Sequence, residues 1–359
     1  MEKGIRIGRV EFFTLFVMAR LFGSLTFVGE GSMPIDTSTA LLGQFIAAIL
    51  AYLLFRFIVK STHNAGVETP LQLFFLMGKS FGRLCTAIMG LCSVVVVIQV
   101  AGSFERYFTS AVYLSAPGVY FVVFFLGAAV YFNYMGIDAM SRLSNILFAG
   151  LVFVLLLLIS GLWQSVELVE VISPFYEGPQ ALGSSIYRSF VDWADLMVMA
   201  MVFAMVSGDA ERPAKWVFGV ALGVAELLSF LLITVLGSYS SRHLFPIHAL
   251  FSAAEVWVPT RVDFLYMLVF TASCLIKAAL HLGFISTCIR TVLPPGAWRY
   301  SLVPPAVAAG AVALFLGHNR TFATGFIALM NSGAPMLAMT LLLPAIAAGL
   351  VKAAGRQQL

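Results

Sequence analysis

Ten long apolar segments, arranged almost end to end, constrain the fold of this chain more than any other feature. A helix needs about 20 apolar residues to cross a bilayer, and most of the segments reach that length. A shorter amphipathic stretch, residues 68–80, is expected to lie on the membrane surface or to pack against the helices. The sequence therefore predicts an all-α membrane protein with about ten transmembrane helices, at residues 8–29, 37–59, 84–110, 117–134, 143–163, 180–207, 214–238, 262–290, 300–317 and 322–351.

Composition excludes several other classes of protein. Only 11% of the residues are charged, whereas a soluble domain carries about 25%, and the net charge of +4 gives no basic surface for nucleic acid. The four cysteines lie in apolar segments without metal-ligand spacing, so we expect no metal or other cofactor. Phosphate-binding loops, zinc-protease motifs and nucleophile elbows are absent from the sequence, and we expect a single transmembrane domain over 1–359 that is not an enzyme.

The placement of Lys and Arg predicts the orientation of the helices. With the N-terminus inside, ten spans return the C-terminus to the same side. Of the 21 Lys and Arg residues, four lie within spans and only three fall in outer loops, which leaves fourteen at the inner ends. Inner loops of membrane proteins carry such an excess of positive charge, so both termini are expected to be cytoplasmic.

The first span carries unusual residues in its middle. Arg20 is a charge at mid-membrane, which is costly unless it faces protein, water or ligand. Gly23 and Ser24 follow it, and such residues tolerate a break in a membrane helix. We predict that this span is interrupted and that Phe22, Gly23 and Ser24 contact a ligand. The alternative is a kinked helix whose small residue allows close helix packing.

The sixth span is too polar for an ordinary helix that faces lipid. Arg188 and Asp192 are four residues apart and can pair on one helix face, and Asp195 follows one turn later. We predict a half-helix to about Ser189, an unwound stretch to about Trp193, and a second half-helix whose N-terminus attracts an anionic group. The alternative is an outer loop before a shorter span. The predicted ligand contacts here are Ser189, Phe190, Val191 and Asp192.

Two further ionisable residues lie in the middle of later spans. Lys277 is central in the eighth span, with His281 one turn later on the same face, and Glu226 is central in the seventh. Intramembrane charges are functional candidates by default. Lys277 either takes the place of a coupling cation or forms a structural pair with Glu226 or Asp195. We therefore predict a coupling or charge-balancing role for Arg20, Asp195, Glu226 and Lys277.

With these segments placed, the chain resembles the spore germination permease family, the B subunits of germinant receptors, over approximately residues 6–352. The opening Ile7-Gly8-Arg9, the later Gly23-Ser24 and Asp36 are similar to the family's first span and loop. Three other stretches carry the resemblance, namely Met77–Gly82 ("lGKxxG"), Gly136–Ser144 ("GieviaRls"), and the ordered set Phe245-Pro246-Ile247, Arg261-Val262-Asp263 and Leu275-Ile276-Lys277 ("YPi…flERlDa…fiK").

The sequence departs from the family pattern at three positions. Thr37 follows Asp36 where the family has an aromatic residue, Thr260 replaces the glutamate of "ERlD", and Ala194-Asp195 replaces a Gly-Glu pair. These departures leave the expected fold unchanged and put the nature of the germinant in doubt.

The resemblance implies a fold and a role. The family belongs to the amino acid–polyamine–organocation transporter superfamily, whose LeuT-type fold has a 5+5 inverted repeat with broken first and sixth helices. Here the repeats would cover about 8–163 and 180–317, followed by a tenth helix at about 322–351. Such subunits bind a small nutrient, often an amino acid, and act with germinant receptor A and C subunits in the spore inner membrane.

Three hypotheses for function follow. The first is a germinant receptor subunit in which ligand binding shifts the balance between two arrangements of the helices. The second is a proton-coupled amino acid transporter that works by alternating access around the same site. The third is a passive channel or scaffold with a vestigial pocket, and the polar residues at both predicted breaks argue against it. Fold alone does not separate the first two, because function resides in the site.

Overall fold

A computed structural model describes residues 7–26, 38–168, 178–193, 195–254 and 263–331, together with Gly333 and Gly349. Over these residues the chain is almost entirely helical. Six helices are long and apolar enough to cross a membrane, and they cover Ser38–Asn64, Lys79–Val112, Gly118–Met135, Ile137–Ser165, Glu211–Leu236 and Asp263–Val292. These six correspond to the second, third, fourth, fifth, seventh and eighth predicted spans.

The other four predicted spans take different forms. The first is the 17-residue helix α1 (Arg9–Leu25), and the ninth is the shorter apolar helix α12 (Val303–His318). The sixth span is divided into α7 (Pro179–Val191) and α8 (Leu196–Phe203). Of the tenth, α13 (Arg320–Asn331) is described, and most of residues 332–351 lie outside the described residues.

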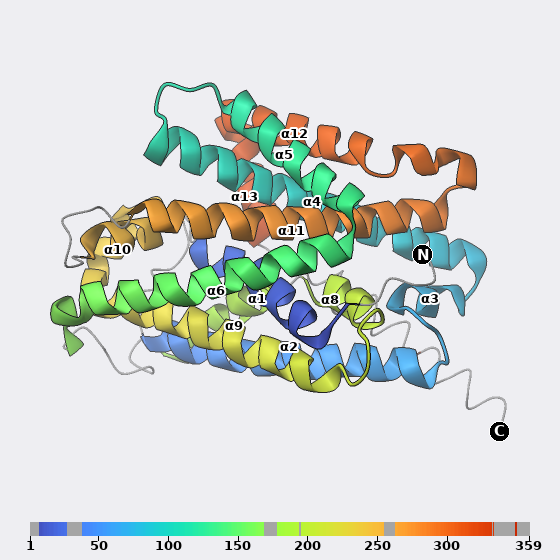
Figure 1. Ribbon diagram of the computed structural model, residues 1–359, viewed down its shortest axis with the longest axis horizontal. Coiled ribbons are helices and arrows are strands. Elements are labelled where there is room, and N and C mark those ends of the chain that lie inside the picture. The colour runs from blue at the N-terminus through green and yellow to red at the C-terminus, as the bar shows by residue number, and fades with distance from the viewer. Residues whose placement is uncertain are drawn as a thin grey trace.

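Two groups of helices form two layers (Figure 1). In the first layer, α11 packs against α4 and α5, and α12 packs against the same two helices. We call this layer the scaffold; it consists of α4 (Lys79–Tyr107), α5 (Gly118–Met135), α11 (Asp263–Val292) and α12.

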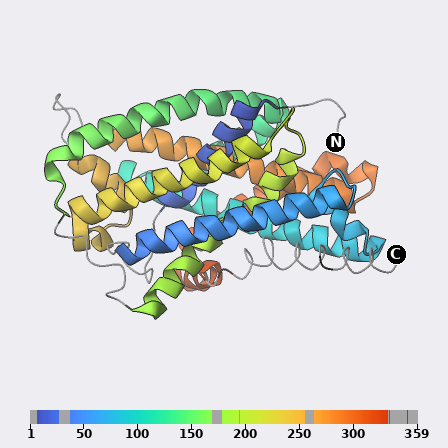
Figure 2. The same cartoon turned by 90° about the horizontal axis from the view of Figure 1, so that it is seen from below.

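The second layer, which we call the bundle, contains both halves of the divided span. Its longest helix, α2, packs against α7 and α9, and α1 packs against α9. Figure 2 shows α2 and α9 running along the length of the molecule. The bundle consists of α1, α2 (Ser38–Asn64), α7, α8 and α9 (Glu211–Leu231). Helix α1 also contacts α11, and α6 (Ile137–Leu162) lies against α1.

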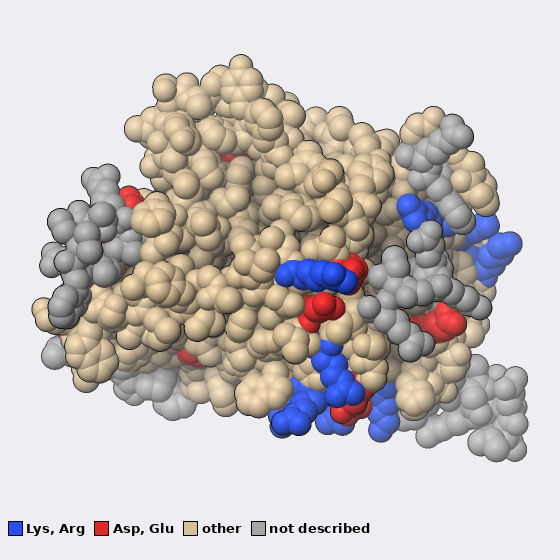
Figure 3. Space-filling view, in the orientation of Figure 1, with Lys and Arg blue, Asp and Glu red and all other residues tan. Residues whose placement is uncertain are grey.

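Two short helices cover the ends of the bundle and scaffold. Helix α3 (Pro70–Phe75) is the amphipathic stretch predicted at 68–80, and it packs against α4 with Leu71, Leu73 and Phe74 buried. Helix α10 (Pro246–Ala253) packs against α11 at the opposite end (Figure 1). On the face that Figure 3 shows, Lys and Arg gather in the half of the molecule that carries α3.

Small residues let the helices approach one another closely. A side chain added at Gly43 of α2 would overlap the side chain of Ser185 on α7, and one added at Gly90 of α4 would lie 3.2 Å from Cys288 Cβ on α11. Lipid offers helices no net hydrophobic drive to associate, so van der Waals packing of this kind has to stabilise the contact. The four cysteines are buried in the scaffold, as their apolar surroundings predicted.

Backbone hydrogen bonds connect the segment before α1 to the segment after α8. The Ile7 amide donates to the Met205 carbonyl at 3.2 Å, and the Ser207 amide donates to the Ile7 carbonyl at 3.0 Å. These bonds form an isolated parallel bridge between Ile7 and Val206. The beginning of the first span and the end of the sixth span are therefore held together within the bundle.

Candidate functional site

The break in the sixth span confirms the predicted division, although it lies two residues later than expected. Helix α7 continues past Ser189 to Val191, and α8 begins at Leu196. The carbonyl of Phe190 accepts the Trp193 amide at 3.0 Å, which closes the end of α7 in a turn. Asp192 and Asp195 are weak helix formers, and their polar side chains favour a turn over a continuing helix.

The first span is not interrupted at Phe22, Gly23 and Ser24, where a break was predicted. Helix α1 is regular through Arg20, Gly23 and Ser24, and it ends at Leu25 with Thr26 as its C-terminal cap. Thr26 donates both its amide and its hydroxyl to the Phe22 carbonyl. The Leu25 carbonyl, which has no partner within the helix, accepts the buried hydroxyl of Tyr266 on α11 at 3.1 Å. Residues 27–37, which follow, lie outside the described residues.

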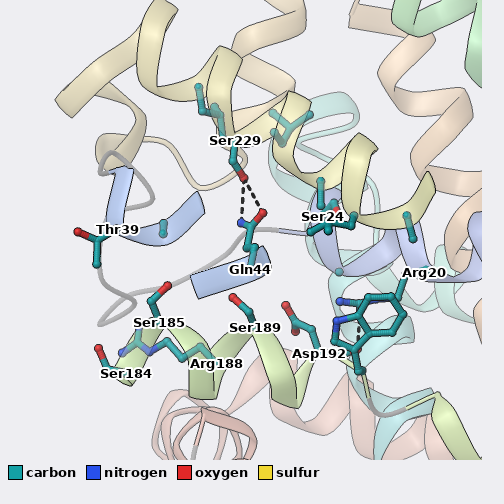
Figure 4. A pocket seen from close by; sticks show the side chains of 18 of the residues that line it. Arg20, Ser24, Thr39, Gln44, Ser184, Ser185, Arg188, Ser189, Asp192 and Ser229 are labelled. Atoms are coloured by element: carbon teal, nitrogen blue, oxygen red, sulfur yellow. Dashed lines mark hydrogen bonds between the residues drawn. The ribbon is translucent and has the colours of Figure 1, made fainter. Parts of the chain in front are cut away.

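A polar cavity of ≈110 Å³ lies between α1, α2, α7 and α9. A single water needs roughly 10–15 Å³ on this measure, so the cavity admits a small molecule. Figure 4 shows Arg20 and Asp192 at one end, Thr39 and Ser184 at the other, and Gln44 between them.

The α7 wall of this cavity is a helical stripe. Residues on one helix face recur at intervals of three and four, and the lining residues of α7 follow that spacing: Ala181, Ser184, Ser185, Arg188, Ser189 and Asp192. On α1 the same spacing brings Arg20, Gly23 and Ser24 to the cavity. Four predicted ligand contacts therefore line it, namely Gly23, Ser24, Ser189 and Asp192.

Three predicted contacts do not line the cavity. Successive residues of a helix are turned by about 100°, so Phe22, Phe190 and Val191 point away from the stripe that their neighbours form. Phe22 is buried in the core, and Phe190 and Val191 are partly buried against it. Arg188 and Asp192, which the spacing places on one helix face, both line the cavity.

Several cavity residues were not predicted as site residues. Gln44 of α2 and Ser229 of α9 hydrogen-bond across the cavity wall, with Gln44 Nε2 2.9 Å from Ser229 Oγ (Figure 4). Both are uncharged polar residues in long apolar spans, and the sequence gives no sign that the two meet. The spacing of Ser184, Ser185 and Arg188 with Asp192 was a usable signal, because it forms a polar face on an otherwise apolar segment.

Arg20 is held against the break at the end of α7. Its Nη1 donates to the Asp192 carbonyl at 2.5 Å, and its guanidinium carbon lies 4.2 Å from the centroid of the Trp193 ring. The other face of Trp193 stacks on Phe218 of α9, at 4.6 Å between ring centroids. A cation at the C-terminal end of a helix complements its dipole, and an aromatic face adds to that attraction. The mid-membrane charge of Arg20 therefore faces protein and the cavity.

Asp195 and Lys277 form a buried ion pair behind the cavity. Lys277 Nζ lies 3.0 Å from Asp195 Oδ2, and His281 Nε2 lies 2.8 Å from Asp195 Oδ1. His281 Nδ1 is 3.3 Å from the Ser93 hydroxyl of α4, and Lys277 Nζ lies 5.2 Å from the centroid of the Phe22 ring. Exposure is only 5% for Lys277, 7% for Asp195 and 1% for His281. We call Asp195, Lys277 and His281 the triad.

The triad resolves one alternative from the sequence. Lys277 pairs with Asp195 and not with Glu226. Asp195 directly precedes α8, but its side chain makes no capping hydrogen bond to that helix, because both carboxylate oxygens bind residues of α11. Glu226 lines no described cavity, and its buried Oε1 has no hydrogen-bond partner in the described part of the chain.

These features define a membrane protein with a transporter-like bundle and a divided sixth helix. No protein-family model matches the chain, and no curated protein matches it. A Na⁺-coupled sialic acid symporter, solved in a substrate-bound outward-open state, is similar in structure, with a TM-score of 0.64 at 14% identity over 94% of this chain and 79% of the symporter.

A second solved structure supports the same fold. Mhp1, a nucleobase-cation-symport-1 family transporter in a closed conformation with bromovinylhydantoin bound, aligns with a TM-score of 0.63 at 15% identity. The alignment covers 93% of this chain and 76% of Mhp1. The chain therefore has the LeuT-type fold of secondary transporters, as the sequence predicted.

Proposed function

We propose that this chain is the ligand-binding membrane subunit of a spore germinant receptor and that it binds a small nutrient, most simply an amino acid. The polar cavity at the divided sixth helix carries the proposal. It offers the guanidinium of Arg20 and the carboxylate of Asp192 at one end and hydroxyl groups along α7. A zwitterion carries the two complementary charges, and buried charges are favourable only when they are paired.

The resemblance of the sequence to germinant receptor B subunits supplies the biological setting. In that setting the chain acts with an A subunit and a C subunit in the spore inner membrane, with both termini on the core side. The gathering of Lys and Arg in the half that carries α3 agrees with this orientation. Ligand binding would then bias the position of the bundle relative to the scaffold, and the partner subunits would read that change.

A test in spores addresses the receptor role. Deleting the coding sequence in the source organism should abolish germination in response to one class of nutrient. Wild type should restore the response, and Ala225→Trp, which fills the cavity from α9, should not. The matched control is Ala308→Trp, on an exposed face of α12 away from the cavity, which should restore it. Unchanged germination of the deletion strain with every nutrient would overturn the receptor role.

A proton-coupled amino acid transporter is the second candidate, because the two solved structures that share this fold are transporters. The two candidates differ in net movement of the ligand. The purified chain in liposomes should bind a labelled amino acid without concentrating it if it is a receptor subunit. Accumulation driven by an inward proton gradient, and lost on adding a protonophore, would favour the transporter.

A further inference from the structure

A second cavity, which we call the inner cavity, lies at the inner ends of the helices. It has a volume of ≈150 Å³ and is formed by the junction of α5 and α6, by α8 and by α11. Its walls are mostly apolar and include the flexible side chains of Met140, Met201 and Met205. Asn133 and Thr287 contribute polar groups. Methionine-rich walls adapt readily to different contents and shapes.

The triad lies next to residues that line the two cavities. On the sixth span, Trp193 lines the polar cavity two residues before Asp195, and Val198 lines the inner one three residues after it. On α11, the lining of the inner cavity begins at Ala279, two residues after Lys277, and His281 lies within that stretch. The buried ion pair therefore joins the stretch of the sixth span between the two linings to the part of α11 that adjoins the inner cavity.

The same triad joins the two layers of the fold. Asp195 belongs to the bundle, whereas Lys277 and His281 belong to the scaffold, and Ser93 of α4 extends the network. Arg20 and Asp192 are the other charged groups near Asp195, and both lie on the polar-cavity side. A relative movement of bundle and scaffold has to break or stretch these contacts.

We propose that the triad is the closed partition of a passage that connects the polar cavity to the inner cavity. Loss of the contact between Asp195 and α11 would join the two cavities and open a continuous route for a small polar solute. The proposal does not depend on the identity of the ligand, since the partition is defined by the protein's own side chains.

Cysteine accessibility tests the partition. In a chain whose four cysteines are changed to Ala, Thr287→Cys places a thiol in the wall of the inner cavity. The probe is a membrane-impermeant methanethiosulfonate carrying a quaternary ammonium, added outside intact cells. The introduced thiol should be inert in this background and should react at least about ten-fold faster when Lys277→Met is added. Thr291→Cys, exposed at the inner end of α11, should react only after lysis and so verifies sidedness.

Two further variants make the result decisive. Lys277→Arg keeps the cation and should leave the thiol inert. His281→Ala keeps the ion pair but removes the second contact to Asp195, and it should also raise the rate of thiol modification. This variant serves as the test if Lys277→Met does not fold. An unchanged rate in the folded Lys277→Met protein, or in His281→Ala when that is the only folded variant, would overturn the partition.

Discussion

Asp195 joins the bundle to the scaffold through both of its carboxylate oxygens, so its removal should be costly. Asp195→Asn leaves the Lys277 ammonium buried without a counter-charge, and breaking a buried pair in this way costs roughly 3–5 kcal/mol. The double variant Asp195→Leu with Lys277→Met removes both charges and should be less destabilising than Asp195→Asn alone. Thermal unfolding in detergent measures the difference. A double variant that is as destabilised as Asp195→Asn, or more so, would contradict the pairing.

Gly23 provides the space that Arg20 needs at the edge of the polar cavity. A Cβ at this position would lie 3.0 Å from Arg20 Nη1 and 3.7 Å from Asp192 Cγ. Gly23→Ala should therefore displace the guanidinium from the Asp192 carbonyl and weaken ligand binding by several-fold without unfolding the helix. Gly223→Ala, on α9 with open space around it, is the matched control and should bind as wild type does. Equal affinities of the two variants, measured by titration calorimetry, would show that Arg20 has no part in the site.

At the scale of single residues, charged side chains within apolar spans were the feature of the sequence that best predicted the site. Arg20, Asp192, Asp195 and Lys277 stood out because ionised groups are rare in apolar spans, and the structure places all four at the divided helix. The sequence did not predict which way a side chain points where the helix was expected to unwind, because helical spacing gives that direction only in a regular helix. Phe22 was predicted as a ligand contact because α1 was expected to break there; in a regular helix it turns toward Lys277 instead.

The contact between α2 and α7 depends on the absence of a side chain at Gly43. An added Cβ would overlap the Ser185 side chain and lie 3.0 Å from the Ser185 carbonyl carbon. Overpacking costs about 1–3 kcal/mol, so Gly43→Ala should lower the Tm and separate the two helices. Gly127→Ala, which meets nothing within 4 Å on α5, should not lower it. Rescue of Gly43→Ala by Ser185→Gly would confirm the contact, and a wild-type Tm for Gly43→Ala would disprove it.

At the scale of helices, hydropathy predicted most of the fold and missed the ends. The long apolar spans were placed within a few residues, because a transmembrane helix must satisfy its own backbone polar groups over its whole length. Helices α2 and α4 extend beyond the predicted apolar cores, to Asn64 and back to Lys79, since charged and polar residues are compatible with a helix outside the hydrocarbon. The exact end of α1 at Leu25 depends on Tyr266, a contact between distant residues.

At the scale of the whole molecule, Lys277 supplies a fixed cation to the carboxylate of Asp195 at the contact between bundle and scaffold. Lys277 already neutralises Asp195, and a sodium ion near the same carboxylate would be repelled by the ammonium. The Tm of the ligand-free protein should therefore be equal in NaCl and in choline chloride at the same ionic strength. Lys277→Gln removes the ammonium and leaves Asp195 with His281 as its remaining partner. This variant should acquire a sodium-dependent Tm, because an ion that binds only the folded state stabilises it. A sodium-dependent Tm in the wild type would contradict this role of Lys277.

Binding of a small nutrient in the polar cavity is tested most directly by thermal shift of the purified chain across a panel of amino acids. A ligand at 100 times its Kd stabilises the folded state by about 2.7 kcal/mol, which is a measurable rise in Tm. One amino acid should raise the Tm of wild type and of Ala308→Trp in a concentration-dependent way and leave Ala225→Trp unchanged. An equal rise in Ala225→Trp, or no rise in any protein across the whole panel, would contradict a ligand site in this cavity.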